Sequence, residues 1–346
     1  MTRDKYTVKF TKPVRSDPTS IRLATPEIVA EYVANRLKTD VIADLGCGIG
    51  IQAIFFAKHS EKVYAVDIDS KRLAYAKYNA RIYGISNIEF IHGDALSSEV
   101  IERLSDVDVI FSDPARRFDV GERRLEDLKP PTLEVIEKYQ HITDRMAFHL
   151  PPMIDPEKVF FDCEREYLSL EGEINRFTVY LGRLKLCERS AIVLPMGARL
   201  ESGSVETPGI PENVGVPRRG FIFEPEPSVV RAELLPELFK YLPEDAALYQ
   251  CEPNGRRLIT SETQSQTPFL KACYRVISTT DFEFNSIRRA LRECSARGVV
   301  LRFRIDPEEY WSVRTMLEAN LTGEKTIHLF RCNNTALLCQ KTRKEI

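Results

Sequence analysis

The sequence predicts an α/β protein with a seven-stranded, largely parallel sheet, followed by a second, smaller α/β domain. Short apolar runs alternate with helical patterns through the first third of the chain, and a glycine-rich turn follows the first run. A segment rich in glycine and proline then precedes a C-terminal part with its own strands and helices. The length of 346 residues fits about two domains at roughly 150 residues each.

The first third contains four short apolar runs that are typical of buried strands: Val41–Leu45, Val63–Val66, Ile88–Ile91 and Val107–Phe111. Helical patterns at Ile51–His59 and Ser70–Tyr83 separate the first three runs, and this order predicts a parallel sheet with helices on both faces. An earlier helix is predicted over Pro26–Leu37, because Thr25 is a good N-cap and proline suits the first helical position.

Three further strands are predicted in the middle of the chain: Ala147–Leu150, Glu166–Leu170 and Ser190–Leu194. Pro151 and Pro152 end the first of them, and a helix is predicted near Glu173–Leu184. Met196–Gly220 holds five glycines and three prolines, which predicts a connector.

The last 77 residues predict a second unit with four strands: Tyr274–Ser278, Val299–Arg304, Thr326–Arg331 and Thr335–Gln340. One helix is predicted over Asn285–Ala296. A second follows Asp306, with Pro307 in its first position and Glu309 in its third, as in a capping box. The expected parts are an N-terminal helical extension, a sheet domain, a linker and a C-terminal domain, at residues 1–40, 41–196, 197–220 and 221–346.

The overall charge excludes a uniformly basic nucleic-acid-binding surface, because 49 basic residues face 51 acidic ones and the net charge is −2. Residues 270–346 hold 14 basic and 9 acidic residues, a net of +5, so residues 1–269 carry −7. No apolar run reaches about 18 residues, and the start MTRDKYTVKF has no apolar segment, so we expect neither a membrane span nor a secretory signal. Eight cysteines without a CxxC pair and five histidines without an HxxxH pair predict a cytoplasmic protein with neither a disulfide framework nor a metal site.

The glycine-rich turn Asp44–Gly50 has the sequence DLGCGIG and follows the first predicted strand. Such a turn between a strand and a helix is typical of a nucleotide-cofactor site. The dinucleotide fingerprint would require glycine at position 51, where Ile51 stands, so the spacing is GxGxG with a preceding acid. Glycines here allow the backbone to approach a cofactor closely.

Acidic residues also follow the next three predicted strands: Asp67, Asp94 and Asp113. Parallel strands place all these ends at one edge of the sheet, which is where open α/β sheets bind ligands. The Asp67 carboxylate can accept hydrogen bonds from the two hydroxyls of a ribose. Asp113 is followed by Pro114, which fixes the loop and directs a carboxylate or carbonyl into the pocket.

The GxGxG turn with its preceding acid resembles motif I of class I S-adenosylmethionine-dependent methyltransferases. Thr25-Pro26-Glu27, Asn79-Ala80, Tyr83-Gly84 and Ile88–Asp94 extend this resemblance to RNA guanine-N2 methyltransferases of the trimethylguanosine synthase type, over about residues 20–115. The resemblance implies a Rossmann-like sheet and S-adenosylmethionine as cofactor. The residues expected to contact that cofactor are Thr25, Asp44, Gly46, Gly48, Gly50, Gln52, Asp67, Ile68, Asp94, Ala95 and Asp113.

The match departs at the acceptor motif. The trimethylguanosine synthase family has Ser-Pro-Pro-Trp there, with a tryptophan that stacks on the cap base, whereas this chain has Ser112-Asp113-Pro114-Ala115, which argues against cap methylation. Asp113 and Pro114 are the expected catalytic residues, since the Asp113 carboxylate and the Pro114 carbonyl would accept hydrogen bonds from the amine and so direct its nitrogen lone pair toward the methyl group. Arg116 and Arg117 either bind a phosphate or base edge or pair with a nearby acid.

The rest of the chain resembles archaeal and bacterial methyltransferases that carry a C-terminal THUMP-like domain. The Asp-Pro-Ala-Arg-Arg acceptor motif, Gly172-Glu173-Ile174, Phe223–Pro227 and Val230-Arg231-Ala232 carry this resemblance. THUMP domains bind tRNA acceptor regions, so the resemblance implies tRNA or rRNA as the substrate.

Asp-Pro-Ala-Arg also occurs in RNA uracil-C5 methyltransferases, which need a nucleophilic cysteine after the fifth strand. This chain has Leu150-Pro151-Pro152 there, and the next thiol is Cys163, so C5 chemistry is disfavoured. Cys47, inside the glycine loop, is expected to pack rather than react.

The basic C-terminal part contains a helix with Ile287, Leu291 and Cys294 on one face and Arg288, Arg289 and Arg292 on the other. Arg302 and Arg304 are expected on one side of the following strand, and Trp311 in the core. The arginines form either a solvated face or a surface that follows RNA phosphates.

Together these features favour a methyltransferase that acts on a base nitrogen of RNA. Two alternatives remain open: a small-molecule or protein methyltransferase with the same cofactor domain, and a catalytically silent RNA-binding protein that binds S-adenosylmethionine.

Overall fold

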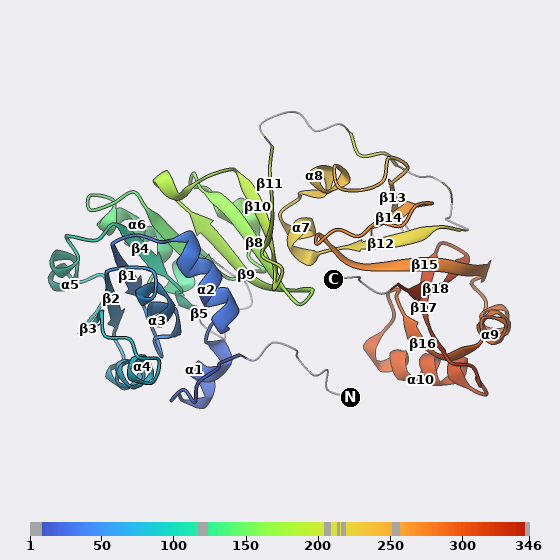
Figure 1. Cartoon of the computed structure of the whole chain (residues 1–346), viewed down its shortest axis with the longest axis horizontal. Helices are drawn as coiled ribbons and strands as arrows, with labels where there is room; N and C mark the ends of the chain where they lie inside the picture. The colour runs from blue at the N-terminus through green and yellow to red at the C-terminus, as the bar shows by residue number, and fades with distance from the viewer. Residues whose placement is uncertain are drawn as a thin grey trace. The chain divides into compact units, whose positions relative to one another are not determined.

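The computed structural model describes residues 9–116, 124–203, 209–212, 215, 219–250 and 257–342. The chain forms two compact units, Met1–Glu201 and Ser202–Ile346 (Figure 1). Among the described residues, no helix is both long enough and apolar enough to cross a bilayer.

The N-terminal unit contains a nine-stranded sheet in the order β11-β10-β8-β9-β7-β4-β1-β2-β3. Its strands are β1 Val41–Leu45, β2 Lys62–Asp67, β3 Ile88–His92, β4 Val109–Ser112, β7 Met146–Leu150, β8 Glu164–Leu170, β9 Glu173–Tyr180, β10 Arg189–Leu194 and β11 Ala198–Glu201. The run from β3 to β7 is entirely parallel, so these five strands end at one edge. From β1 the chain proceeds to β2 and β3 on one side, while β4 and β7 lie on the other side. A ligand site is therefore expected outside the ends of β1 and β4.

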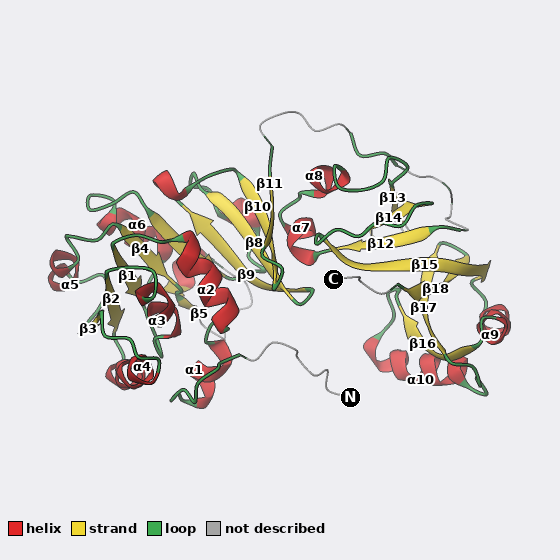
Figure 2. Ribbon diagram, in the orientation of Figure 1, coloured by secondary structure: helices red, strands yellow, loops and turns green. Residues whose placement is uncertain are grey.

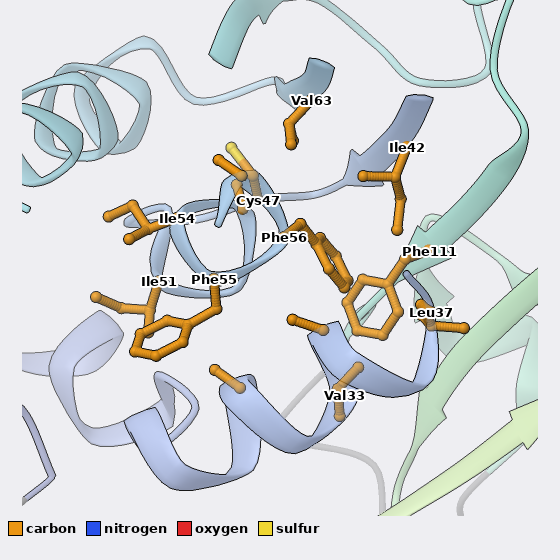
Figure 3. Close-up of a cluster of buried hydrophobic side chains, with 14 of the residues drawn as sticks. Val33, Leu37, Ile42, Cys47, Ile51, Ile54, Phe55, Phe56, Val63 and Phe111 are labelled. Carbon is orange, nitrogen blue, oxygen red and sulfur yellow. The ribbon is translucent and has the colours of Figure 1, made fainter. Parts of the chain in front are cut away.

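The helices of this unit are α1 Pro18–Leu23, α2 Glu27–Arg36, α3 Ile51–Ala57, α4 Ser70–Ile82, α5 Ser98–Arg103 and α6 Thr132–Tyr139. Figure 3 shows how the core joins α2 and α3 to the sheet: Val33 and Phe56 converge near Phe111 of β4. All seven residues of α3 are buried, so the helix that follows the glycine loop lies within the core.

The predicted strands of the N-terminal unit, and the helices predicted before residue 84, are confirmed to within about two residues at each end. The sheet has nine strands rather than seven, however, because two strands were not predicted. One is β11, which lies inside the segment expected to be a connector. Outside the nine-stranded sheet, β5 Ala115–Arg116 and β6 Leu128–Lys129 pair with each other and are not counted among its strands.

The second unpredicted strand is β9, and the helix expected near Glu173–Leu184 is wrong. Glu171 and Gly172 both have positive φ values, 52° and 77°, which match the tight turn of a β-hairpin. The chain then returns as β9 between β7 and β8, antiparallel to both. Pairing on both sides stabilises β9, and so does the stacking of Phe177 on Tyr167, with 4.4 Å between the ring centroids. These tertiary contacts override the helical pattern of the local sequence.

The second unit contains a seven-stranded mixed sheet in the order β13-β14-β12-β15-β18-β17-β16 (Figure 2). Its strands are β12 Phe221–Pro225, β13 Ala247–Gln250, β14 Arg257–Ser261, β15 Leu270–Asp281, β16 Ala296–Leu301, β17 Lys325–Cys332 and β18 Thr335–Lys341. Its helices are α7 Pro227–Arg231, α8 Leu235–Phe239, α9 Phe284–Glu293 and α10 Pro307–Glu318. The predicted second α/β unit is therefore confirmed at the level of its fold class.

Two predictions in this unit are corrected. β16 ends at Leu301, the last residue that pairs with β17, so Arg302 and Arg304 lie beyond the strand. Trp311 is 67% exposed rather than in the core. α10 packs through Tyr310, Val313 and Leu317, a spacing of three and four residues, and Trp311 lies outside that stripe.

Candidate active site

The glycine loop after β1 has the geometry that its spacing predicts. Gly46, Gly48 and Gly50 all have positive φ values, of 82°, 57° and 83°. A Cβ atom on Gly50 would lie 2.7 Å from the Cβ of Ala76 on α4, so only glycine fits there without displacing the helix. A Cβ on Gly48 would meet nothing within 4 Å, so this side of the loop faces open space that a ligand can use.

Asp67, the last residue of β2, holds the loop. Its Oδ2 accepts a hydrogen bond from the Gly48 backbone N–H at 2.7 Å, and its Oδ1 accepts one from the Asp69 N–H at 2.8 Å. The side chain is buried, whereas Ile68 beside it is 71% exposed. The site therefore presents an exposed apolar side chain beside a carboxylate that is fixed by two backbone N–H groups.

Asp44 is buried inside β1, and its Oδ2 has no hydrogen-bond partner. Burial raises the pKa of this carboxyl well above its usual range, with further increases from Asp113 and Asp67, while a hydrogen bond from the Ala53 N–H opposes them. Three carboxyl groups therefore interact at the edge where β1, β2 and β4 end. This arrangement favours a cationic ligand group, which would compensate their mutual repulsion.

Asp113 lies directly after β4, as predicted, and Pro114 is buried behind it. Its carboxylate faces His149 of β7, with 3.7 Å between Oδ2 and Nδ1, and it interacts electrostatically with Arg176 of β9. The Arg176 Nη2 donates to Thr25 Oγ1 at 3.0 Å, which links the loop before α2 to this end of the site.

Sequence reasoning missed His149 and Arg176. His149 stands near the carboxyl end of the fifth parallel strand, beside the strand that precedes Asp113, so its position alone could have identified it. Arg176 was hidden because its strand was predicted to be a helix.

The other expected cofactor residues have different surroundings. Gln52 is buried and donates from Nε2 to the Ala30 carbonyl at 3.2 Å, which ties α3 to α2. Asp94 is exposed after β3, and its Oδ1 accepts from the Leu96 N–H at 2.9 Å. Ala95 is buried, and its carbonyl accepts from the Tyr139 hydroxyl at 2.6 Å.

Asn79, on α4, joins the glycine loop to the N-terminal segment. Its Nδ2 donates to the carbonyls of Ile49 and Arg15 at 2.9 and 3.0 Å, and its Oδ1 accepts from the Arg15 N–H at 2.8 Å. This side chain is completely buried, so the Asn-Ala pair noted in the sequence has a structural role beside the site.

Neither of the two cysteines considered in the sequence analysis has the properties of a nucleophile, and Cys163 precedes β8, at the edge of the sheet opposite to the glycine loop. Burial raises the pKa of Cys163 to about 11, and burial also raises that of Cys47 well above its usual range. Arg117 and the side chain of Arg116 lie outside the described residues. Within the described ranges, no group of three or more His, Cys, Asp and Glu side chains gathers to hold a metal ion.

The predicted arginines of the second unit separate into two kinds. Arg289 and Arg292 are exposed on α9. Arg288 is half-buried, and its Nη2 donates to the Ala319 carbonyl at 3.3 Å, at the end of α10. It therefore fastens the two helices together, whereas its neighbours can bind a ligand.

Residues 39–159 match the family model described as RNA cap guanine-N2 methyltransferase. An uncharacterized RNA methyltransferase of Oceanobacillus iheyensis is 40% identical over 89 residues, which are 25% of this chain and 19% of that protein. The trimethylguanosine synthase of Schizosaccharomyces pombe is 35% identical over 96 residues, which are 26% of this chain and 40% of that protein. An uncharacterized protein of Methanocaldococcus jannaschii is 42% identical over 92 residues, 27% of this chain and 34% of that protein. Each match spans less than half of the relative's length.

A crystal structure from Porphyromonas gingivalis W83, described as a methyltransferase, is similar over 94% of this chain and 83% of that chain. The TM-score is 0.74 at 17% sequence identity, which establishes a shared fold. The chain therefore has a methyltransferase-like α/β fold, and its residues 39–159 are similar to the RNA cap guanine-N2 methyltransferase family.

Proposed function

We propose that this protein is an S-adenosylmethionine-dependent methyltransferase that methylates a base nitrogen of RNA. The observation that carries the proposal is the glycine loop after β1, whose Gly48 N–H donates to Asp67 Oδ2 at 2.7 Å, at the point where the strand order reverses. The matched family model and the RNA methyltransferase relatives support RNA as the substrate.

The residues present fit the cofactor. When bound, S-adenosylmethionine supplies a methyl group on a cationic sulfonium. The open side of Gly48 admits a ligand close to the backbone, and the exposed Ile68 offers an apolar surface to its base. The buried Asp44 carboxyl has one unpartnered oxygen, and a bound cation would stabilise its ionised form.

Asp113 is the catalytic residue of this proposal. Its carboxylate accepts an N–H of the acceptor amino group, which turns the nitrogen lone pair toward the methyl group. Once the nitrogen has gained the methyl group it must lose a proton, and Asp113 accepts that proton and passes it to water, because its side chain is 42% exposed. The matched guanine-N2 family model favours an exocyclic amine of guanine as the acceptor.

We assign RNA binding to the second unit and propose that it is THUMP-like. Its exposed Arg289 and Arg292 can pair with phosphates. The exposed Trp311, with the Arg314 guanidinium 5.4 Å from its ring, offers a surface on which a base can stack. This assignment explains why the basic charge lies in the C-terminal part of the chain.

Labelled S-adenosylmethionine incubated with the protein and total RNA, total protein or a small-molecule extract tests the proposal. We expect label in RNA alone, and nucleoside analysis should locate it on a base nitrogen. Asp113→Asn should reduce transfer by about 100-fold or more and leave cofactor affinity within about threefold. Label in protein or in small molecules would overturn the RNA assignment, and cofactor binding without any transfer would overturn the enzyme.

A further inference from the structure

We propose, on the basis of the function proposed above, that His149 is the positioning residue for Asp113. The Nδ1–H of a neutral His149 imidazole holds one oxygen of the Asp113 carboxylate and directs the other toward the acceptor amine.

The two side chains come from adjacent strands, because β4 pairs with β7 and Ser112 lies opposite Phe148. Nδ1 of His149 is 3.7 Å from Oδ2 of Asp113, and the histidine side chain is only 1% exposed. The His149 ring packs edge-to-face against Phe111, with 4.9 Å between the ring centroids and 88° between the ring planes, and this contact restricts rotation of the imidazole. The structure places Nδ1 of the buried imidazole on the side of the carboxylate.

Neither ring nitrogen of His149 has a hydrogen-bond partner among the described residues. A buried polar group without a partner costs about 1–3 kcal/mol, so a structural histidine would be expected to have one. The 3.7 Å separation is slightly longer than a hydrogen bond, and catalytic hydrogen bonds commonly shorten when the substrate binds. His149 is thus placed for a bond that forms fully in the occupied site.

The charged groups that face His149 keep its imidazole neutral. Burial lowers its pKa below the usual value, Asp113 acts in the opposite direction, and Arg176 lowers it further. A neutral donor matters here, because an imidazolium beside Asp113 would neutralise the negative charge that the acceptor N–H requires. Since the pKa is depressed, the neutral form should persist throughout the physiological pH range.

Three proteins test the role in catalysis: wild type, His149→Phe and His149→Asn. Phenylalanine keeps the ring packing but removes the donor, so kcat for methyl transfer from labelled cofactor to total RNA should fall about 10- to 100-fold. KM for RNA and Kd for S-adenosylmethionine should each change by less than about twofold. Asparagine places an amide N–H near the Nδ1 position and should recover at least about a third of the activity.

The double variant distinguishes positioning from a general structural effect. Because His149 acts through Asp113, His149→Phe should cause no further loss in an Asp113→Asn background. A wild-type kcat in His149→Phe, no recovery in His149→Asn, or an additive loss in the double variant would each overturn the proposal.

Ring ¹⁵N spectra of the full chain provide a readout that does not depend on activity. Each of the five histidines gives its own signals, and His149→Phe identifies those of His149 by their loss. We expect a neutral ring at about pH 7 with the proton on Nδ1, and a change in its shift in Asp113→Asn. An imidazolium, or a proton on Nε2, would contradict the proposal. Absence of RNA methylation by the wild type would contradict the proposed function and leave this measurement to decide the role of His149.

Discussion

At the scale of single residues, the site places several carboxyl groups close together. Asp44 is buried with an unpartnered oxygen, and both Asp113 and Asp67 add to the burial effect that raises its pKa. A carboxyl group whose pKa is raised on folding stabilises the folded chain less when it is ionised than when it is neutral. In the proposed function a bound cation would stabilise the ionised Asp44 carboxyl, so this residue would lower the stability of the ligand-free protein and raise its affinity for the cofactor.

Asp44→Asn should therefore raise the free energy of unfolding at about pH 7 by on the order of 1–3 kcal/mol and weaken S-adenosylmethionine binding about tenfold or more. The pKa of Asp44 in the folded state lies above its unfolded value of about 3.9. The wild type therefore loses stability as the pH rises from the unfolded pKa to the folded pKa of this group. The stability difference between variant and wild type should vanish at lower pH, where Asp44 is protonated in both states. Urea denaturation at several pH values and calorimetric titration measure the two quantities.

Asp40→Asn is the matched control, since this exposed side chain precedes the same strand. It should change neither quantity by more than about 0.5 kcal/mol. A lower stability of Asp44→Asn at neutral pH would contradict this reading of the buried carboxyl.

Gly50→Ala should destabilise the protein by about 2–4 kcal/mol, because a Cβ at positive φ meets Ala76. Gly84 also has a positive φ, of 73°, but open space around it, so Gly84→Ala should cost only about 1 kcal/mol. Thermal or urea denaturation compares them. Equal losses would mean that the contact between the loop and α4 is not tight.

At the scale of elements, the sheet extends beyond its parallel part through β8, β9, β10 and β11. A buried ion network holds this extension together. Arg199 of β11 donates to Glu164 and Glu166 of β8, both at 2.7 Å, and both carboxylates are buried. Tyr32 of α2 and Tyr180 of β9 also donate to Glu166, at 2.7 and 2.9 Å, so the network connects helix and sheet.

Arg199→Met should destabilise the N-terminal unit by about 3–5 kcal/mol, because it leaves two buried carboxylates without their main cation. Arg183 pairs with Asp144 at 3.0 Å, but both side chains are exposed, and Arg183→Ala should cost less than about 1 kcal/mol. Denaturant midpoints of the two variants test the contrast. A small loss in Arg199→Met would mean that Arg36, 3.1 Å from Glu164, is sufficient.

At the scale of the whole molecule, the charge of the chain is divided. Residues 1–269 carry −7 and residues 270–346 carry +5, although the total is only −2. The acidic groups beside the glycine loop would repel a polyanion, so the proposed RNA substrate needs a compensating basic surface elsewhere. We propose that the exposed arginines of α9 contribute to it.

A double variant, Arg289→Glu with Arg292→Glu, should weaken RNA binding and reduce the slope of log affinity against log salt by about 1.5. Cofactor affinity should be unchanged. Arg219→Glu, an exposed charge reversal before β12 in the same unit, should alter the slope much less. Binding isotherms at several salt concentrations give the slopes, and equal slopes for all proteins would exclude α9 from the RNA interface.

Much of the fold could be predicted from the sequence because its signals are local. The alternation of apolar runs and helical patterns located β1 to β4, and the GxGxG spacing located a loop with three left-handed glycines. The helix cap at Asp306 was likewise predicted, and its side chain accepts from the Glu308 N–H at 2.9 Å. The exposed Trp311 was predicted wrongly, since burial depends on which stripe of α10 faces the sheet.

The sequence by itself determined where the parallel strands lie along the chain, where the glycine loop lies, and which acids follow the strands. These features could be predicted because periodicity and turn chemistry act over a few residues. Only the tertiary structure decided that Glu173–Tyr180 is a strand, since its pairing partners lie on β7 and β8. That pairing brings Arg176 into electrostatic contact with Asp113, and the pairing of β7 with β4 places His149 beside the same carboxylate. Contacts between strands that are distant in sequence leave no local pattern, and for that reason the two neighbours of Asp113 emerged only from the fold.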